Sequence, residues 1–174
     1  MRADEVGLDV RESAEDVART LAGYHGAIGA RVFEHSKVER MAASVDVPVV
    51  NMLSDVSHPL QALADMLTIR QEFGELAGRT VAYVGDANNV GIACGLAGMH
   101  FRVASPAGYQ FGELDLDRIR SSGVDPLVTE NADEAVDGVD VVYTDVWTSM
   151  GQETEKSARL DALGAYAVNS SLIS

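Results

Sequence analysis

The run Thr80-Val81-Ala82-Tyr83-Val84-Gly85-Asp86 decides the fold. Its apolar, β-branched residues predict a short buried strand, and the glycine followed by an acid predicts a turn at the strand's carboxyl end. Including this one, such runs occur at 26–33, 47–52, 80–85, 100–105, 126–129, 139–145 and 165–169, and most of them are separated by amphipathic stretches. This alternation is typical of βαβ units, so we predict an α/β fold with a Rossmann-like parallel sheet flanked by helices.

Two helices are predicted before the second of these runs. The first covers 13–24. The second ends near Ser44, and it has Ser36 followed three residues later by Glu39, which is the spacing of a capping box.

The longest predicted helix covers 58–73, with Ser57 placed to cap it and Pro59 tolerated in its first turn. Its apolar residues at i, i+3, i+4, i+7 spacing predict a buried stripe of Leu60, Leu63, Ala64 and Leu67. The helix joins two strand runs, so we predict that it connects two lobes. The first is a partial lobe at 1–73 that ends with this helix, and the second is an α/β lobe at 79–174.

Composition restricts the possible partners. The chain has 174 residues, 47% of them hydrophobic, and a formal net charge of −14, which disfavours nucleic acid and anionic membranes. The single cysteine, Cys94, excludes an internal disulfide and offers no metal-ligand cluster. The sequence has no signal-peptide pattern and no run of about 18 apolar residues. We therefore expect a cytoplasmic protein without a metal, whose partners are small molecules or proteins.

Three segments carry polar groups suited to a small ligand. Ser57-His58-Pro59-Leu60-Gln61 places an imidazole, an amide and free backbone N–H groups at a helix start. In 84–90 a strand runs into two asparagines, and in 142–151 a strand ends in an acid and a loop with hydroxyl groups. Ligands bind at the carboxyl ends of strands in open α/β sheets, so both loops are candidates.

Each segment also has a plainer interpretation. A histidine and a glutamine at a helix start are often surface residues without a ligand. Asp86 and Asn88 could simply build a turn and cap a helix, and Asp145 is as suited to capping a turn as to binding. The dinucleotide spacing G-x-G-x-x-G is absent from 84–90, so this turn is not a dinucleotide-binding fingerprint.

In this order, the segments resemble the ornithine carbamoyltransferases of the aspartate/ornithine carbamoyltransferase family. HPLQALAD at 58–65 is similar to the family's H-P-x-Q-A-L-A-D segment, and GDANNV at 85–90 to its G-D-x-N-N turn. DVWTSMG at 145–151 resembles its D-x-W-x-S-M-G loop, whose serine–methionine–glycine step separates the ornithine enzymes from the aspartate enzymes. GARVF at 29–33 resembles the strand end that supplies an arginine to carbamoyl phosphate.

The resemblance implies roles for particular side chains. Arg31 and His58 would be catalytic, donating to the carbonyl oxygen of carbamoyl phosphate, while Gln61 would hold the amide end. The residues that would bind L-ornithine are Asn89, Asp145, Ser149 and Met150. Their chemistry agrees, because a carboxylate suits the α-ammonium group, whereas an amide and backbone N–H groups suit the carboxylate.

The family's reaction transfers the carbamoyl group to the side-chain amine of L-ornithine, giving L-citrulline and phosphate in arginine biosynthesis or other arginine and ornithine metabolism. It uses neither a metal nor an organic cofactor. Donors aimed at the carbonyl oxygen stabilise the negative charge that develops there, by about 3 kcal/mol each in other acyl-transfer enzymes. The resemblance also implies a homo-oligomer, namely a trimer.

Three family features are not found in this sequence. They are a serine–threonine–arginine–threonine–arginine phosphate loop, a histidine–cysteine–leucine–proline segment with the final helix, and about one turn of the helix after Asn89. The short helix also holds Gly91 and Gly95, each costing up to about 1 kcal/mol relative to alanine. We expect a second lobe that is incomplete at its C-terminus and little or no activity from this chain alone.

Two alternatives stay open. A non-catalytic module could bind an amino acid or pair with another carbamoyltransferase chain, because missing lobes would expose apolar strand edges and faces. Carbamoyl transfer to another amine or amino acid is the other alternative, although Ser149-Met150-Gly151 argues against aspartate.

Overall fold

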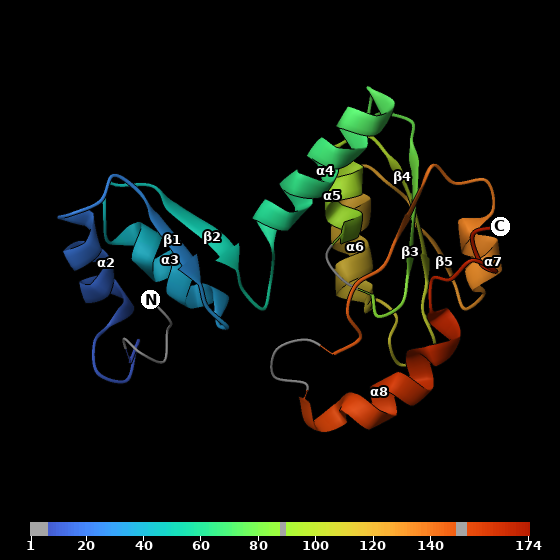
Figure 1. Ribbon diagram of the computed structural model, residues 1–174. Helices are drawn as coiled ribbons and strands as arrows, with labels where there is room; N and C mark the ends of the chain where they lie inside the picture. Colours follow the sequence, from blue (N-terminus) through green and yellow to red (C-terminus); the bar gives the residue numbers. More distant parts are fainter. Residues whose placement is uncertain (1–6, 88–89, 149–152) are drawn as a thin grey trace. The chain divides into compact units, whose positions relative to one another are not determined.

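The computed structural model describes residues 7–87, 90–148 and 153–174. The chain forms two compact units, Met1–Asp65 and Met66–Ser174, and both are built from parallel strands and helices (Figure 1). The α/β class and the parallel sheet predicted from the alternating runs are therefore confirmed.

The first unit contains a two-stranded parallel sheet. Its strands pair from Ile28 with Val49 to Arg31 with Leu53. Helices pack on this pair through a small core of Ala14, Ala18, Ile28, Ala30, Val32, Val38 and Met41. The elements are α2 (Ala14–Ala22), β1 (Ile28–Arg31), α3 (His35–Ala43) and β2 (Val49–Leu53).

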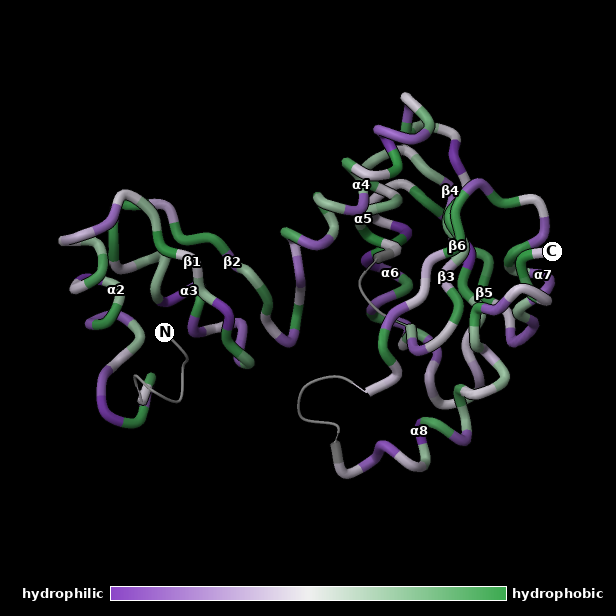
Figure 2. The backbone as a smooth tube through the Cα atoms, in the orientation of Figure 1, coloured by the Kyte–Doolittle hydropathy of each residue, from purple (hydrophilic) through white to green (hydrophobic). Residues whose placement is uncertain are grey.

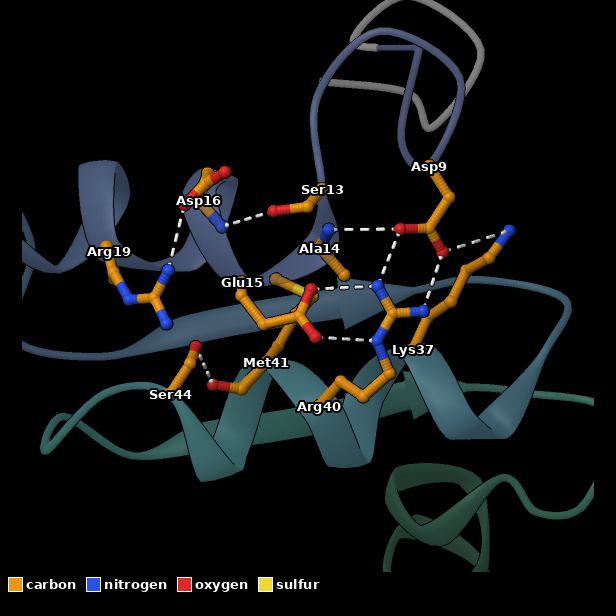
Figure 3. A network of polar contacts seen from close by, with 10 residues as sticks. All are labelled: Asp9, Ser13, Ala14, Glu15, Asp16, Arg19, Lys37, Arg40, Met41 and Ser44. Atoms are coloured by element: carbon orange, nitrogen blue, oxygen red, sulfur yellow. Dashed lines mark hydrogen bonds and ion pairs between the residues drawn. The ribbon is translucent and has the colours of Figure 1, made fainter.

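A polar network ties the segment before α2 to α3 (Figure 3). The Arg40 guanidinium lies between two carboxylates, with Nη2 2.7 Å from Asp9 Oδ1 and 2.8 Å from Glu15 Oε2. Hydrogen bonds from Arg40 lower the pKa of Glu15 to about 2 and also lower the pKa of Asp9. Asp9 Oδ1 accepts the Ala14 N–H and Ser13 Oγ accepts the Asp16 N–H, so both side chains satisfy backbone donors at the start of α2.

The capping box predicted for the second helix is wrong. The helix α3 begins at His35, one residue before Ser36, and the Glu34 side chain at its N-cap makes no capping hydrogen bond. The His35 N–H instead donates to Asp55 Oδ1 at 2.9 Å. Since this acceptor lies 20 residues further along the chain, no local pattern could indicate it.

The long helix α4 (Pro59–Phe73) differs from its prediction at its start and in its buried face. His58 Nδ1 accepts the Gln61 N–H at 3.4 Å, whereas the Ser57 hydroxyl accepts from Asn51 Nδ2 at 3.2 Å. We predicted that Ser57 caps this helix, and that prediction is wrong. The side chain that accepts a first-turn N–H is His58.

The predicted buried stripe of α4 is also wrong. Leu60, Leu63 and Leu67 are 39%, 66% and 55% exposed, and Ala64 is exposed too. Ile69 is the buried residue of the helix and packs with Met66 and Phe73 against the second unit's core. The helix has apolar residues on more than one side, so its sequence is compatible with more than one buried stripe. Packing against the core buries the side that carries Met66, Ile69 and Phe73.

The second unit holds a four-stranded parallel sheet in the order β5-β4-β3-β6. Figure 2 shows its strands mostly in hydrophobic colours. Its regular elements are β3 (Thr80–Val84), α5 (Val90–Leu96), β4 (His100–Ala104), α6 (Glu113–Ser121), β5 (Leu127–Thr129), α7 (Ala132–Val136), β6 (Val141–Tyr143), η1 (Glu153–Glu155), α8 (Lys156–Leu163) and η2 (Gly164–Tyr166).

Helices cover both faces of this sheet. One face packs against α4, α5 and α6 through a core that includes Ile69, Val81, Tyr83, Cys94, Phe101, Val103 and Ile119. The other face packs against α7 and η2 through Val84, Ala104, Ala135 and Tyr166. The run 165–169, which we predicted as a strand, instead begins inside η2, because Tyr166 packs on the sheet face and donates its hydroxyl to the Glu130 carbonyl at 2.7 Å.

The glycines of α5 permit close packing. An added Cβ at Gly91 would lie 2.7 Å from the Phe101 ring and 2.8 Å from Ile119, and one at Gly95 would lie 1.9 Å from Ser122 Oγ. Their cost in helix propensity is thus accompanied by a tight approach of α5 to β4 and α6. Within the described residues, no helix is both long and apolar enough to cross a membrane.

Candidate functional site

The first unit carries three of the predicted site residues. Arg31 is exposed and is the last residue of β1, beside Leu53 near the end of β2. His58 immediately precedes α4, and Gln61 lies in its first turn, where Gln61 Nε2 donates to Asp65 Oδ1 at 2.8 Å. All three therefore follow or end strands of one parallel pair, where ligand positions are expected.

A hydrogen-bonded turn holds the segment between β2 and α4. The buried Ser54 hydroxyl accepts from Asn51 Nδ2 at 3.1 Å and from the Ser57 N–H at 3.3 Å, and it lies 2.8 Å from His35 Nδ1. The Ser54 N–H donates to the Ser57 carbonyl at 3.0 Å. These contacts fix the backbone immediately before His58.

The second unit carries the remaining predicted residues, and three of them, Asn89, Ser149 and Met150, lie outside the described residues. Asp145 is exposed and lies two residues after β6. Its Oδ1 accepts the N–H of the next residue, Val146, at 2.7 Å. The carboxylate is therefore held by the neighbouring backbone and presented at the carboxyl end of a strand.

The loops after β3 and β6 lie next to each other at that end of the sheet. Gly85 has a φ of +136°, a conformation that favours glycine, and a Cβ there would lie 3.6 Å from Trp147 Nε1 and 3.7 Å from Thr144 Oγ1. The Thr144 hydroxyl donates to the Val84 carbonyl at 2.9 Å. The two segments predicted to form one ligand site, 84–90 and 142–151, thus come together where both are described.

Sequence reasoning missed one residue of this region, Arg159 of α8. Its guanidinium pairs with Asp86 and donates from Nε to the Trp147 carbonyl at 2.6 Å. Partial burial raises the pKa of Asp86, and the neighbouring Arg159 charge opposes that shift. In the sequence, Arg159 is one of several charged residues between Glu153 and Asp161, and no local pattern distinguishes it.

Within the described ranges, no group of three or more His, Cys, Asp or Glu side chains is arranged to hold a metal ion. The polar groups that the two units do present are guanidinium, imidazole, amide and carboxylate. Such groups bind small polar molecules through charge-assisted hydrogen bonds.

Comparison with known proteins defines the class. Residues 77–174 match the Asp/Orn binding domain of aspartate/ornithine carbamoyltransferases, and residues 2–71 match the carbamoyl-P binding domain. The chain belongs to the aspartate/ornithine carbamoyltransferase family, which confirms the resemblance carried by its motifs.

The similar proteins are ornithine carbamoyltransferases. The chain is 42% identical to that of Haloquadratum walsbyi over 98% of its own length and 44% identical to that of Bacillus subtilis over 94%. It covers 58% and 54% of these relatives, so it spans little more than half their length.

Solved structures agree with this relationship. The Thermus thermophilus ornithine carbamoyltransferase superposes with a TM-score of 0.83 at 41% identity, covering 99% of this chain and 57% of that one. The Pyrococcus furiosus enzyme gives 0.84 at 42% identity, covering 94% and 55%.

Proposed function

We propose that this chain carries carbamoyl phosphate-binding and L-ornithine-binding parts of an ornithine carbamoyltransferase. The reaction would transfer the carbamoyl group from carbamoyl phosphate to the side-chain amine of L-ornithine, yielding L-citrulline and phosphate. Residues 1–73 would belong to the carbamoyl phosphate lobe and 79–174 to the ornithine lobe. The observation that carries the proposal is the match of the two halves of the chain to the family's two domains.

In the first lobe, Arg31 and His58 would donate to the carbamoyl oxygen, and Gln61 would hold the carbamoyl amide. Support comes from their positions at the strand ends and helix start of one unit, and from the hydrogen-bonded turn before His58. As the amine attacks, negative charge develops on the carbamoyl oxygen. A positioned guanidinium and imidazole N–H would stabilise it by about 3 kcal/mol each, as oxyanion donors do in other acyl transfers.

In the second lobe, Asp145 would pair with the α-ammonium group of ornithine. Its exposure and the hydrogen bond that its carboxylate accepts from the Val146 N–H support this role, because an oriented carboxylate loses less freedom on binding. Asn89 and the Ser149–Met150 segment would hold the α-carboxylate, leaving the side-chain amine to reach the carbamoyl carbon.

Binding of amino acids tests the acceptor assignment. Titration calorimetry on the 174-residue chain should detect L-ornithine and no comparable binding of L-aspartate. Asp145→Ala should weaken ornithine binding at least about tenfold, since a charge-assisted hydrogen bond contributes about 1.5–3 kcal/mol.

Asp125→Ala is the matched control, because this carboxylate is 89% exposed and precedes β5, at the opposite end of the same sheet. Equal ornithine affinity in the Asp145 variant and the control would contradict the assigned pocket. Preference for aspartate would contradict the acceptor.

Assembly and setting are proposed from the family alone. We propose a homotrimer that acts in the cytoplasm in arginine biosynthesis or in other arginine and ornithine metabolism. Light scattering after size exclusion, with and without a full-length carbamoyltransferase, measures the assembly. A purely monomeric chain in both samples would contradict the trimer.

A further inference from the structure

Arg159 is the buried cation of the second unit. Its side chain is 7% exposed, and among the described residues it is the only charged residue that is buried. Burial of a charge is unfavourable unless the charge is paired and hydrogen-bonded. The contacts of this guanidinium therefore indicate what it does in the fold.

Those contacts reach the loops after two different strands. Nη2 pairs with Asp86, which follows β3, and Nε donates to the Trp147 carbonyl, which follows β6, at 2.6 Å. Nη1 also reaches Glu155, the N-cap residue of α8, at 3.4 Å. One planar group thus joins α8 to both loops at the carboxyl end of the sheet.

Tyr109 adds another connection to the same loop region. The guanidinium carbon of Arg159 lies 5.0 Å from the centre of the Tyr109 ring, within the range of a cation–π contact. The Tyr109 carbonyl accepts the Ala87 N–H at 3.0 Å, so the residue after Asp86 is held as well. Asp86 and Ala87, which follow β3, are therefore held by a side chain and by a neighbouring backbone.

We propose that Arg159 is a positioning residue of the acceptor site, which holds residues 85–87 after β3 and residues 144–148 after β6 in the arrangement that binds ornithine. The inference rests on the proposed function, because these loops lead into Asn89 and contain Asp145. Arg159 acts through Asp86 and Trp147 and not on the ligand. A lysine cannot replace it, because its single ammonium lacks the planar fork that reaches separate acceptors in fixed directions.

A second arginine of the same unit provides a control that distinguishes an effect on loop positioning from a general effect on stability. Arg79 pairs with Asp140 at 2.8 Å and lies 4.9 Å from the centre of the Phe73 ring, so its contacts are of the same chemical kind. Arg79 and Asp140 precede β3 and β6, which places this pair at the opposite end of the sheet. Arg79→Lys is thus the matched control for Arg159→Lys.

Trp147, the only tryptophan of the chain, reports the loop directly. Acrylamide quenching of its fluorescence should increase in Arg159→Lys, while far-UV circular dichroism stays that of the folded chain. Ornithine affinity measured by calorimetry should fall at least about tenfold, as for loss of a charge-assisted hydrogen bond. Arg79→Lys should change neither quenching nor affinity.

The outcomes distinguish the two proposals. If the unsubstituted chain does not bind ornithine, the proposed function fails, whereas the quenching comparison still decides whether Arg159 holds the loops. If Arg159→Lys does not fold, Asp86→Asn is measured in its place, because it keeps an acceptor oxygen and removes the ionic partner. A folded variant with unchanged quenching and unchanged affinity would overturn the positioning role.

Discussion

Replacing Gly91 by alanine tests whether packing or helix propensity governs α5. Alanine is favoured over glycine in a helix interior by about 1 kcal/mol. Against this, the new Cβ would meet Phe101 at 2.7 Å and Ile119 at 2.8 Å, and both side chains are almost fully buried. Overpacking of a core costs about 1–3 kcal/mol, and contacts this short belong in the upper part of that range. The variant should therefore lose about 1–2 kcal/mol of unfolding free energy.

Urea unfolding followed by Trp147 fluorescence measures this loss, because the tryptophan lies in the same unit as Gly91. With a slope near 2 kcal/mol per molar urea, the midpoint should fall by about 0.5–1 M. Gly164→Ala is the control, since nothing lies within 4 Å of its added Cβ and its backbone is helical. That variant should gain about 0.4–1 kcal/mol. If Gly91→Ala were as stable as the control, the steric argument would be refuted.

Two further predictions concern packing and charge. Ile69→Ala should cost about 2–4 kcal/mol of unfolding free energy, because it removes a buried side chain. Leu63→Gln, at an exposed position, should change it by less than about 0.5 kcal/mol. Equal costs of the two variants in urea titrations would contradict the assignment of the buried face of α4. The folded-state pKa of Glu15, about 2, lies below its ordinary 4.5, so its contribution to stability is present above pH 4.5 and is lost as the pH falls toward 2. The protection of α2 and α3 amides against hydrogen exchange, taken relative to the intrinsic exchange rate at each pH, should fall over that range. Arg40→Met should abolish most of this dependence, and an unchanged profile in the variant would show that Arg40 does not set it.

In each unit, the strands that lead to the candidate site residues were predictable from sequence. A parallel strand buried on both faces is a continuous apolar run, and 80–85 shows this without help from distant residues. The positions of Arg31, His58 and Asp145 at strand ends and a helix start follow from the same pattern. The chemical roles of these residues remain proposals.

What could not be predicted depends on contacts between distant residues. The helix α3 takes its first N–H acceptor from Asp55, and α4 buries Ile69 because the second unit's core selects that face. Likewise, nothing near Arg159 in the sequence indicates that its partners are Asp86 and the Trp147 carbonyl. Local periodicity locates helices and strands but does not decide which of several apolar faces or charged groups becomes buried.

The position of Cys94 allows opening of the second unit to be measured through the reactivity of its thiol. The thiol is fully buried on α5, and the chain has no other cysteine. A thiol reagent can therefore react only when the unit opens. At low reagent concentration the labelling rate reports the opening equilibrium, and at high concentration it reports the opening rate. Because the first unit has no cysteine, the labelling does not report fluctuations of the first unit. Following that rate with and without ornithine would show how far ligand binding reaches into the interior of the sheet.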